Sequence, residues 1–445
     1  MKNLVKKIIV WKLNILARMY LRRFKPTIVA VTGNVGKTST KEAIATVLST
    51  VKNIRSGKGN LNNEFGVPLT IIGDYMDDYY EGGNTALFWF RVLWSAFFKF
   101  PFIKNYPEVL VLEYGADKPG DIKRLCQMFK PHVAVVTAVG EVPVHVEFFQ
   151  SAETLGREKA ELVKCLWSTD HVVLNYDDEV VLEMKEKTKA HVHTFGFAPT
   201  SSVGVPTPLG VGSANSIWVS NFDLRADDNS KPLGVLFKLG QGEHAFVPVK
   251  IDGSLGKSQA WSAAAAASVG LIFKMNLVEI SEALAGYLGP KGRMRILKGI
   301  KDTIIIDDTY NASPASTYLA LETLKEFSGR KVVVLGDMLE LGEFTEIAHR
   351  EAGNFAASFA DVLVCVGARM KFAADAAANQ MLNIHTFETS EIAKQKVQEL
   401  LQLGDLVLVK GSQGMRMEKI VEEIMADPLN KKDLLVRQSK KWLSK

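Results

Sequence analysis

Cysteine is scarce in this chain of 445 residues, which contains only Cys126, Cys165 and Cys365. These three residues lie too far apart in the sequence to form a CxxC zinc ribbon or a disulfide framework. We therefore expect a protein of a reducing compartment, the cytoplasm. Hydrophobic residues make up 47% of the chain and charged residues 23%, which excludes a disordered, collagenous or coiled-coil protein. At roughly 150 residues per domain, the length predicts about three domains or two large ones.

Acidic residues are missing from the first 25 residues, which contain eight Lys or Arg. The polar residues here recur at helical spacing and form one stripe, Asn3, Lys7, Asn14, Arg18 and Arg22. Charges interrupt this segment too often for a bilayer-spanning helix, and it lacks the uncharged core and cleavage site of a signal peptide. Two interpretations stay open: the helix lies on an anionic membrane surface, or it packs on its own domain.

A second unusual segment, ALFWFRVLWSAFFKFPFI at residues 86–103, has eight aromatic residues and only Arg91 and Lys99 as charges. It is too short and too charged to be a convincing transmembrane helix. Buried core is one interpretation of this segment. Aromatic residues interleaved with cations are also typical of a membrane interface, and we favour surface attachment because the basic segment offers a second such surface.

Short β-branched runs alternate with helical patterns along most of the chain, which predicts an α/β fold with mostly parallel sheets. The first such runs are 27–31, 109–112, 133–137 and 172–174. Residues 197–250 interrupt the alternation and predict antiparallel strands appended to the same domain. An Ala-rich helix at 259–271 and a second helix ending near Gly286 are expected next.

A break at Gly289, Pro290 and Gly292 separates this part from a second alternating part. Its strands are expected at 303–306, 331–335, 362–366 and 406–409. This pattern predicts a Rossmann-like domain. No internal repeat or long low-complexity linker is visible, so a short hinge should join the domains. We therefore predict a basic amphipathic helix at 1–25, a central domain at 26–296 and a C-terminal Rossmann-like domain at 297–445.

The most informative local motif is TGNVGKTS at residues 32–39, which directly follows a strand and opens a helix. Glycines let backbone N–H groups converge on phosphates there, and the helix N-terminus adds its positive dipole end. Lys37 would reach the outer phosphates and Thr38 would bind Mg²⁺. Val31 replaces the first Gly of the common GxxxxGK[ST] pattern, but the strand, turn and helix context supports a P-loop ATP-binding domain.

Further hard oxygen ligands are needed for a nucleotide bound with Mg²⁺. Glu113 ends the predicted strand VLVLEYG, at the edge where open α/β sheets bind ligands. His145, in GEVPVHVEFF, and Lys159, in REKAEL, have no assignable role from the residues alone.

Together these pieces resemble one family, the Mur ligases, ATP-dependent enzymes that build the peptide stem of the bacterial cell wall. The resemblance extends from Val29 to Glu418. Besides the phosphate loop it is carried by the motifs LEYGADKPGDI, REKAEL, KGRMR, DDTYNASPAS, LGDMLELGE and KGSQGMRME. These motifs are most similar to the branch that joins D-alanyl-D-alanine to UDP-N-acetylmuramoyl-tripeptide. The resemblance implies these two small-molecule partners, and no nucleic acid.

The resemblance also implies roles for individual residues. Lys37, His145 and Lys159 would be catalytic, with Lys159 carbamylated into an anion that supports a second Mg²⁺. The metal ligands would be Thr38, Glu113, His145 and the Lys159 carbamate. ATP would contact Thr32, Gly33, Asn34, Val35, Gly36, Lys37, Thr38, Ser39, Gln259, Arg293 and Asp308. The substrates would contact Asn62, Asn63, Asn311, Ser313 and Pro314.

The implied reaction transfers the γ-phosphoryl group of ATP to a carboxylate, after which an amine attacks the acyl phosphate and an amide forms. Two departures from the family pattern qualify this expectation. Ser258 stands where the family usually has His, and only about 25 residues precede the first predicted strand. That length is too short for the N-terminal domain that usually holds the UDP-linked end.

Three interpretations follow from these departures. The chain is the D-alanyl-D-alanine-adding ligase, or it is a related ligase acting on a lipid-linked or other carboxylate at a membrane. In the third interpretation, it is a non-catalytic ATP-binding scaffold of wall synthesis. The scaffold is least favoured, because the residues for the chemistry are all present.

Overall fold

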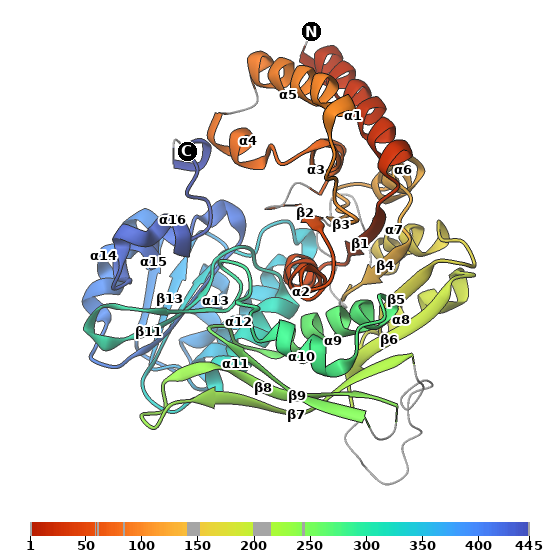
Figure 1. Cartoon of the computed structure of the whole chain (residues 1–445). Helices are drawn as coiled ribbons and strands as arrows, with labels where there is room; N and C mark the ends of the chain where they lie inside the picture. Colours follow the sequence, from red (N-terminus) through yellow and green to blue (C-terminus); the bar gives the residue numbers. More distant parts are fainter. Residues whose placement is uncertain are drawn as a thin grey trace.

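Two β-sheets with helices on both faces form the molecule (Figure 1). The computed structural model describes residues 2–57, 59, 62–82, 85–139, 152–198, 215–242 and 245–443. The predicted α/β fold class, with a large, mostly parallel sheet and a second mixed sheet, is confirmed.

The first sheet has nine strands in the order β2-β3-β1-β4-β5-β6-β7-β8-β9. Its strands are β1 (Thr27–Thr32), β2 (Ile54–Ser56), β3 (Val109–Glu113), β4 (Val133–Val136), β5 (His171–Asn175), β6 (His191–Phe197), β7 (Ser216–Ala226), β8 (Pro232–Gln241) and β9 (Ala245–Asp252). Neighbours from β2 to β7 are parallel, and β7, β8 and β9 are antiparallel. The predicted antiparallel strands therefore extend the parallel sheet through the β6–β7 pair.

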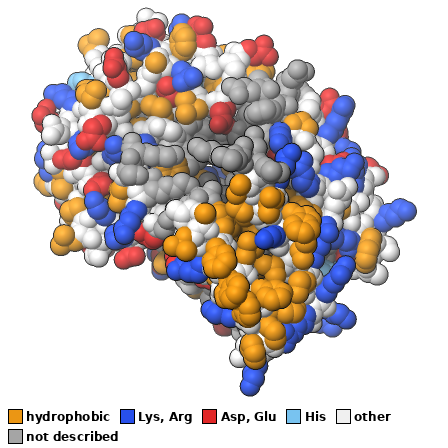
Figure 2. All heavy atoms as spheres, turned by 90° about the horizontal axis from the view of Figure 1, so that it is seen from above, with side chains coloured by type: hydrophobic (Ala, Val, Ile, Leu, Met, Phe, Trp, Pro, Cys, Tyr) orange, Lys and Arg blue, Asp and Glu red, His pale blue; other side chains and the backbone are white. Residues whose placement is uncertain are grey.

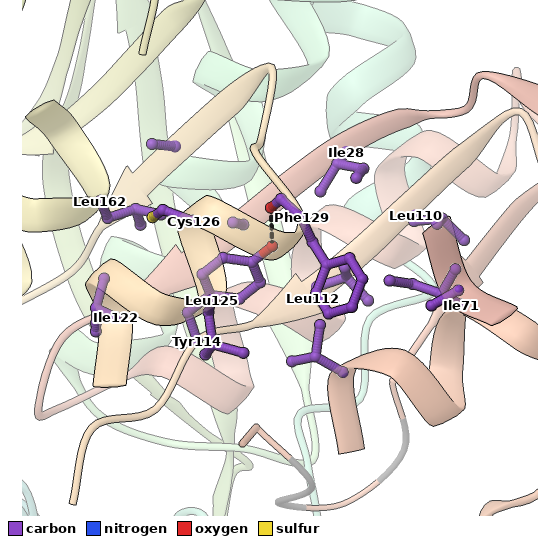
Figure 3. Packing of buried hydrophobic residues seen from close by; sticks show 14 of the residues in the cluster. Ile28, Ile71, Leu110, Leu112, Tyr114, Ile122, Leu125, Cys126, Phe129 and Leu162 are labelled. Atoms are coloured by element: carbon purple, nitrogen blue, oxygen red, sulfur yellow. Dashed lines mark hydrogen bonds between the residues drawn. The ribbon is translucent and has the colours of Figure 1, made fainter. Parts of the chain in front are cut away.

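The strand β1 shows how the sequence creates two cores. Ile28 and Ala30 face one side of the sheet and Val29 and Val31 face the other, because side chains alternate along a strand. Figure 3 shows the first of these cores, where the buried Tyr114 hydroxyl donates a hydrogen bond to the Phe129 carbonyl. The alternating burial fixes the register that brings the phosphate loop to the carboxyl edge of the sheet.

The helices of this part are α1 (Lys2–Phe24), α2 (Lys37–Ser49), α3 (Gly66–Ile72), α4 (Met76–Gly82), α5 (Ala86–Lys99), α6 (Asp121–Met128), α7 (Ala152–Lys164), α8 (Glu179–Leu182), α9 (Lys257–Ile272) and α10 (Leu277–Leu284). Residues of α1, α3, α5, α6 and α7 contribute to one core, and residues of α2, α9 and α10 contribute to the other. The two helices expected at 259–271 and before Gly286 are present as α9 and α10.

The N-terminal helix α1 packs on its own domain through one face. Leu13, Leu16 and Tyr20 are buried, and the Tyr20 hydroxyl donates to the Ala96 carbonyl of α5 at 2.7 Å. This confirms one of the two interpretations of the basic segment. Among the described residues, no helix is both long and apolar enough to cross a bilayer.

The second sheet has six strands in the order β10-β11-β15-β12-β13-β14. They are β10 (Arg295–Lys298), β11 (Ile304–Asp308), β12 (Lys331–Gly336), β13 (Val362–Val366), β14 (Ile384–Phe387) and β15 (Leu406–Lys410). All neighbours are parallel except β10 and β11. The strand β10 crosses the predicted domain boundary at residues 296 and 297, and its pairing with β11 makes it part of the second sheet.

Helices cover both faces of the second sheet. They are α11 (Pro314–Lys325), α12 (Thr345–Ala357), α13 (Lys371–Ala377), α14 (Ser390–Leu400), α15 (Glu418–Ile424), α16 (Lys431–Leu434) and α17 (Lys440–Leu443). The helix α17 lies against α4 of the first part, and it helps to close the space between the two sheets.

Candidate active site

The phosphate loop connects the end of β1 to the start of α2, and its backbone requires glycine at two positions. Gly33 has φ 142° and Gly36 has φ 85°, conformations that other residues rarely adopt. A Cβ atom on Gly33 would also lie 2.0 Å from Thr137 Oγ1. The loop therefore passes very close to the segment that follows β4.

Hydrogen bonds hold the loop against that segment. Asn34 N donates to Ala138 O at 2.6 Å, and Asn34 Nδ2 donates to Val139 O at 2.6 Å. The Thr137 hydroxyl donates to Val35 O at 2.7 Å. The helix α2 has no side-chain cap at Gly36, so the N–H groups of its first turn remain open to an anion.

Lys37 lies half-buried at the first position of α2. Its ammonium donates to Gly33 O at 2.8 Å and to Asn34 O at 3.2 Å, both within the loop. Burial lowers the pKa of Lys37 below its usual value, while the nearby Glu113 carboxylate acts in the opposite direction. The ammonium is thus tied to the loop that would hold the phosphates.

Glu113 is buried at the carboxyl end of β3, where it accepts two side-chain hydrogen bonds. Thr38 Oγ1 donates to Oε2 at 3.0 Å, and Asn62 Nδ2 donates to Oε1 at 3.0 Å. Burial alone would raise the pKa of the Glu113 carboxyl, but the charges of Lys41 and Lys37 and these two hydrogen bonds hold it below its usual value. A hydroxyl oxygen therefore adjoins an ionised carboxylate, a donor set that suits Mg²⁺.

Lys159 is buried on α7, with a relative exposure of 2%. Burial and, to a smaller extent, the charge of Lys37 lower its pKa to about 7, although Glu158, Glu113 and Asp117 act to raise it. A lysine on a helix is usually exposed to solvent, and Lys159 is not. Glu158, the residue before it, accepts hydrogen bonds from Gly120 N at 2.8 Å and Ile122 N at 2.9 Å, and so holds α7 against the start of α6.

One cavity of about 660 Å³ brings many of the predicted residues together from both sheets. From the first part it is lined by Asn34, Val35, Lys37, Asn62, Asp117 and Lys159. From the segment before β10 it is lined by Arg293, and from the second part by Asn311, Ser313, Leu339, Ser412 and Gln413. The guanidinium of Arg293 lies 4.0 Å above the Tyr310 ring, and its buried Nε has no hydrogen-bond partner within the described residues. A phosphate oxygen would supply such a partner.

A smaller cavity of about 50 Å³ adjoins the start of α2 and contains Gly36, Ser39, Ser258, Arg293 and Asp308 among its lining residues. Gln259 lies fully buried beside it, where its amide donates to Arg293 O at 3.3 Å and its Oε1 accepts from the Tyr287 hydroxyl at 3.2 Å. Gln259 is thus engaged by the protein itself.

A larger cavity of about 760 Å³ lies between α4, residues 287–291 and the C-terminal residues 435–442. Thr38 lines this cavity, but Lys37 and Lys159 do not, and both lysines line the cavity of about 660 Å³. We therefore locate the reaction in the cavity of about 660 Å³.

Other predicted residues make hydrogen bonds within the segments next to the cavity. The Thr32 hydroxyl donates to Tyr114 O at 2.8 Å, and Asn63 Oδ1 accepts from Phe65 N at 3.1 Å at the start of α3. Ser313 caps α11, of which Pro314 is the first residue. His145 falls outside the described residues.

Two buried lysines belong to the site although sequence reasoning did not single them out. Lys41, on the buried side of α2, donates to the Gly57 carbonyl, and its charge helps to keep Glu113 ionised. Lys410 donates to Asp308 Oδ2 at 2.6 Å and to Asn311 O at 3.0 Å. Lys410 directly follows the predicted strand 406–409 and is the last residue of β15. Its position at a carboxyl strand end was the signal that could have identified it.

Family models match two long segments of the chain. Residues 99–253 match the Mur ligase middle domain, and residues 292–413 match the glutamate ligase domain of Mur ligases, together more than half of the chain. The chain belongs to the Mur ligase family. Glu113 and Lys159 lie within the first matched segment, and the loop at 311–313 lies within the second.

Relatives within the Mur ligase family agree with this assignment. The chain is 28% identical over 422 residues to the UDP-N-acetylmuramoyl-tripeptide–D-alanyl-D-alanine ligase of Bacillus subtilis, a match that covers 93% of this chain and 79% of that protein. The ligase of the same name from Mycobacterium leprae is 29% identical, covering 90% of this chain and 74% of that protein. The structure of MurF ligase from Thermotoga maritima in complex with ADP is similar with a TM-score of 0.73 and 26% identity, covering 93% of this chain and 83% of that one.

Proposed function

We propose that this Mur ligase uses ATP to join D-alanyl-D-alanine to the tripeptide carboxylate of a UDP-linked muramoyl precursor, releasing ADP and phosphate. The observation that carries the proposal is the cavity of about 660 Å³, in which Lys37 and Lys159 face Asn311 and Ser313 from the other sheet. The names of the relatives from Bacillus subtilis and Mycobacterium leprae supply the two substrates.

Activation of the carboxylate is the first chemical problem that the site solves. A carboxylate resists attack by an amine, so the γ-phosphoryl group is first transferred to it and an acyl phosphate with a good leaving group results. Lys37 and the open N–H groups at the start of α2 bind the phosphates and neutralise the charge that develops on them. Arg293, in the segment before β10, lines the same cavity, and its Nε has no hydrogen-bond partner within the described residues.

Thr38 and Glu113 would hold Mg²⁺ beside this cavity, because their side chains lie within hydrogen-bond distance of each other. Asn62, which donates to Glu113, lines the cavity. The metal supplies charge that screens the transferring phosphoryl group. Lys159 would contribute a second anionic ligand as a carbamate. Its pKa of about 7 leaves a substantial share of the amine unprotonated near neutral pH, and an unprotonated amine is what the addition of CO₂ requires. His145 would complete the ligands.

Amide formation is the second chemical problem, and the second sheet contributes to it. The amine of D-alanyl-D-alanine attacks the acyl phosphate, and phosphate leaves. Asn311 and Ser313, in the loop between β11 and α11, line the cavity, where this loop would orient the incoming dipeptide. Approach of this domain to the first sheet would bring the amine within attacking distance and exclude water.

The proposed division of labour follows the two sheets. Residues 26–296 would bind ATP and the carboxylate, residues 297–445 would bind the dipeptide and the ribose through Asp308, and residues 1–25 would form an accessory helix. We place the enzyme in the cytoplasm, where ATP and the nucleotide-linked precursor are available.

Release of ADP measured with the complete chain tests the proposal. Turnover should require D-alanyl-D-alanine and the UDP-linked muramoyl-tripeptide together, and mass spectrometry should find the amide product. Other dipeptides and a lipid-linked acceptor serve as competing substrates. ADP release without amide formation, or product only from the lipid-linked acceptor, would overturn the proposed substrate pair.

A further inference from the structure

An apolar face formed by α1, α5 and the turn Phe100–Phe102 is exposed at one end of the molecule, far from the second sheet (Figure 1). On α1 it contains Ile8, Trp11 and Ile15, with relative exposures of 45%, 62% and 40%. Their spacing of three and four residues places them on one side of the helix, away from the buried Leu13. We call this surface the α1–α5 face.

The helix α5 continues the face with large aromatic side chains. Phe90, Trp94 and Phe97 are 61%, 56% and 54% exposed, whereas Phe88 and Val92 on the opposite side are buried. The rings of Phe90 and Trp94 stack with centroids 5.6 Å apart. Isolated exposed apolar residues are normal in proteins, but a contiguous patch of this kind marks a binding surface.

Positive charge borders the patch, as Figure 2 shows for the Lys and Arg side chains around the hydrophobic ones. Lys7, Lys12, Arg18 and Arg22 are exposed on α1. Within the described part of the chain these four residues form no ion pair. Residues 1–25 contain no acidic residue to compensate them, so the rim of the patch keeps its positive charge.

Two acidic side chains close to the face are paired with basic residues. Glu64 lies 3.2 Å from Lys6 and 3.3 Å from Arg124, and Asp78 pairs with Arg91 of α5. The field above the face is therefore positive, and it attracts an anionic surface.

The face is also preformed, because α1 and α5 are joined by specific contacts. Tyr20 donates to Ala96 O at 2.7 Å, and Arg23 donates to the Phe100 carbonyl while its guanidinium lies 4.9 Å from the Phe100 ring. A partner would therefore meet a rigid apolar surface and would not have to order it.

We propose that the α1–α5 face docks the enzyme on an anionic lipid bilayer, with the aromatic rings in the interfacial region and the cations against the headgroups. Trp and Phe side chains flanked by Lys and Arg are suited to that boundary. A second copy of this chain would place like charges opposite each other, which is unfavourable.

Docking would bring the substrate-binding edge close to the membrane. Lys6 of α1 pairs with Glu64 and lies 5.1 Å from the Phe65 ring. Glu64 and Phe65 are two and three residues after Asn62, which lines the cavity of about 660 Å³. The inference does not depend on the identity of the carboxylate substrate.

Vesicle flotation with the full chain tests the proposal. Vesicles of phosphatidylcholine with phosphatidylglycerol should carry the protein at low salt, and vesicles of phosphatidylcholine alone should carry much less. Added salt should release it, because charges at the surface are screened. The double variant K7E/R18E should weaken binding about tenfold or more. The double variant W94E/F97E should abolish it.

Matched controls change equally exposed residues elsewhere. The variant K298E/K371E reverses two exposed cations of the second domain, and L382E/L429E places charge on side chains that are 99% and 94% exposed. Both controls should float like the unchanged protein. All variants should keep their thermal midpoint and their affinity for ATP, which separates this test from that of the ligase activity.

Two results would overturn the proposal. In the first, the unchanged protein fails to float with anionic vesicles at low salt, or the W94E/F97E variant floats as well as the unchanged protein. In the second, sedimentation velocity finds a dimer that W94E/F97E dissociates and that does not bind vesicles, so that the face joins two copies.

Discussion

Lys410 and Asp308 form a buried ion pair, with Lys410 Nζ 2.6 Å from Asp308 Oδ2. The lysine ends β15 and the aspartate ends β11, two neighbouring parallel strands whose register places these residues side by side. Met294 N also donates to Asp308 Oδ1 at 3.2 Å. The pair therefore links the segment between the two sheets to the loop that carries Asn311, whose carbonyl accepts from the same ammonium.

Removal of one partner of this pair should destabilise the protein. We expect Lys410→Met to lower the free energy of unfolding by about 3 kcal/mol, because the Asp308 carboxylate would remain buried without a counter-ion. Adding Asp308→Asn to Lys410→Met should recover part of the loss. Urea unfolding followed by circular dichroism measures both, with Lys371→Met at an exposed lysine as the control. Unchanged stability of Lys410→Met would contradict the pair's importance.

Loss of the Lys37 ammonium should stop ATP turnover without unfolding the protein. The Lys37 side chain is half-buried, and within the described residues its hydrogen bonds go to carbonyl groups of its own loop. Lys37→Ala therefore removes phosphate-binding charge and little packing. ADP release should fall at least about a hundredfold, while the circular dichroism spectrum stays the same. Lys123→Ala, at an exposed lysine of α6, is the control. Retained turnover would remove the phosphate-loop assignment.

The role of Lys159 as an anionic metal ligand is open to chemical rescue. Lys159→Ala should be nearly inactive, and added formate or acetate should restore part of the activity by occupying the vacated position. Lys164→Ala changes an exposed lysine at the end of the same helix and should remain active. A fully active Lys159→Ala enzyme would show that the buried amine serves packing alone.

A pair of histidines should make the stability of the first domain depend on pH. His193 Nε2 lies 3.0 Å from His171 Nδ1, and burial together with the neighbouring His171 and His191 lowers the pKa of His193 to about 4. The unfolded state has a pKa of about 6.5 and binds a proton first as the pH falls. Stability should therefore be complete above pH 6.5 and be lost between about pH 6.5 and 4.

The size of this effect should be on the order of 1 kcal/mol, after allowance for the solvent that still reaches the ring. His193→Gln should flatten the decline of the thermal midpoint over this pH range. An equally steep decline in the variant would show that other groups cause it.

The sequence was sufficient for the strands that are rich in β-branched residues, such as β1 and β13. It did not reveal β2, β10 or β14, whose short segments IRS, RILK and IHTF carry little pattern of their own. Each of these three strands lies at an edge of its sheet and therefore pairs with a single neighbouring strand. Their extended conformation depends on hydrogen bonds to that neighbour, which no local pattern contains.

The sequence predicted those site residues that lie in a specific motif, such as Lys37 in the phosphate loop. Lys41 and Lys410 were not recognised, because a lysine in a helix or at a strand end is usually exposed. Only the three-dimensional packing shows that Lys41 is 1% exposed and that Lys410 is as well. The sequence could not decide between the two interpretations of α1 for a similar reason. An amphipathic pattern shows that a helix has two different faces, but it does not show what each face contacts.

The contact between Gly33 and Thr137 also determines what nucleotide binding costs. Because the loop is already fixed to the segment after β4 by the hydrogen bonds of Asn34 and Val35, a nucleotide does not have to pay the entropy of ordering it. This contribution to the binding free energy comes from the phosphate loop alone, so it does not depend on how the protein contacts the base and the sugar. A larger residue at position 33 would displace Thr137 and would thus weaken every phosphate ligand alike, ADP as well as ATP.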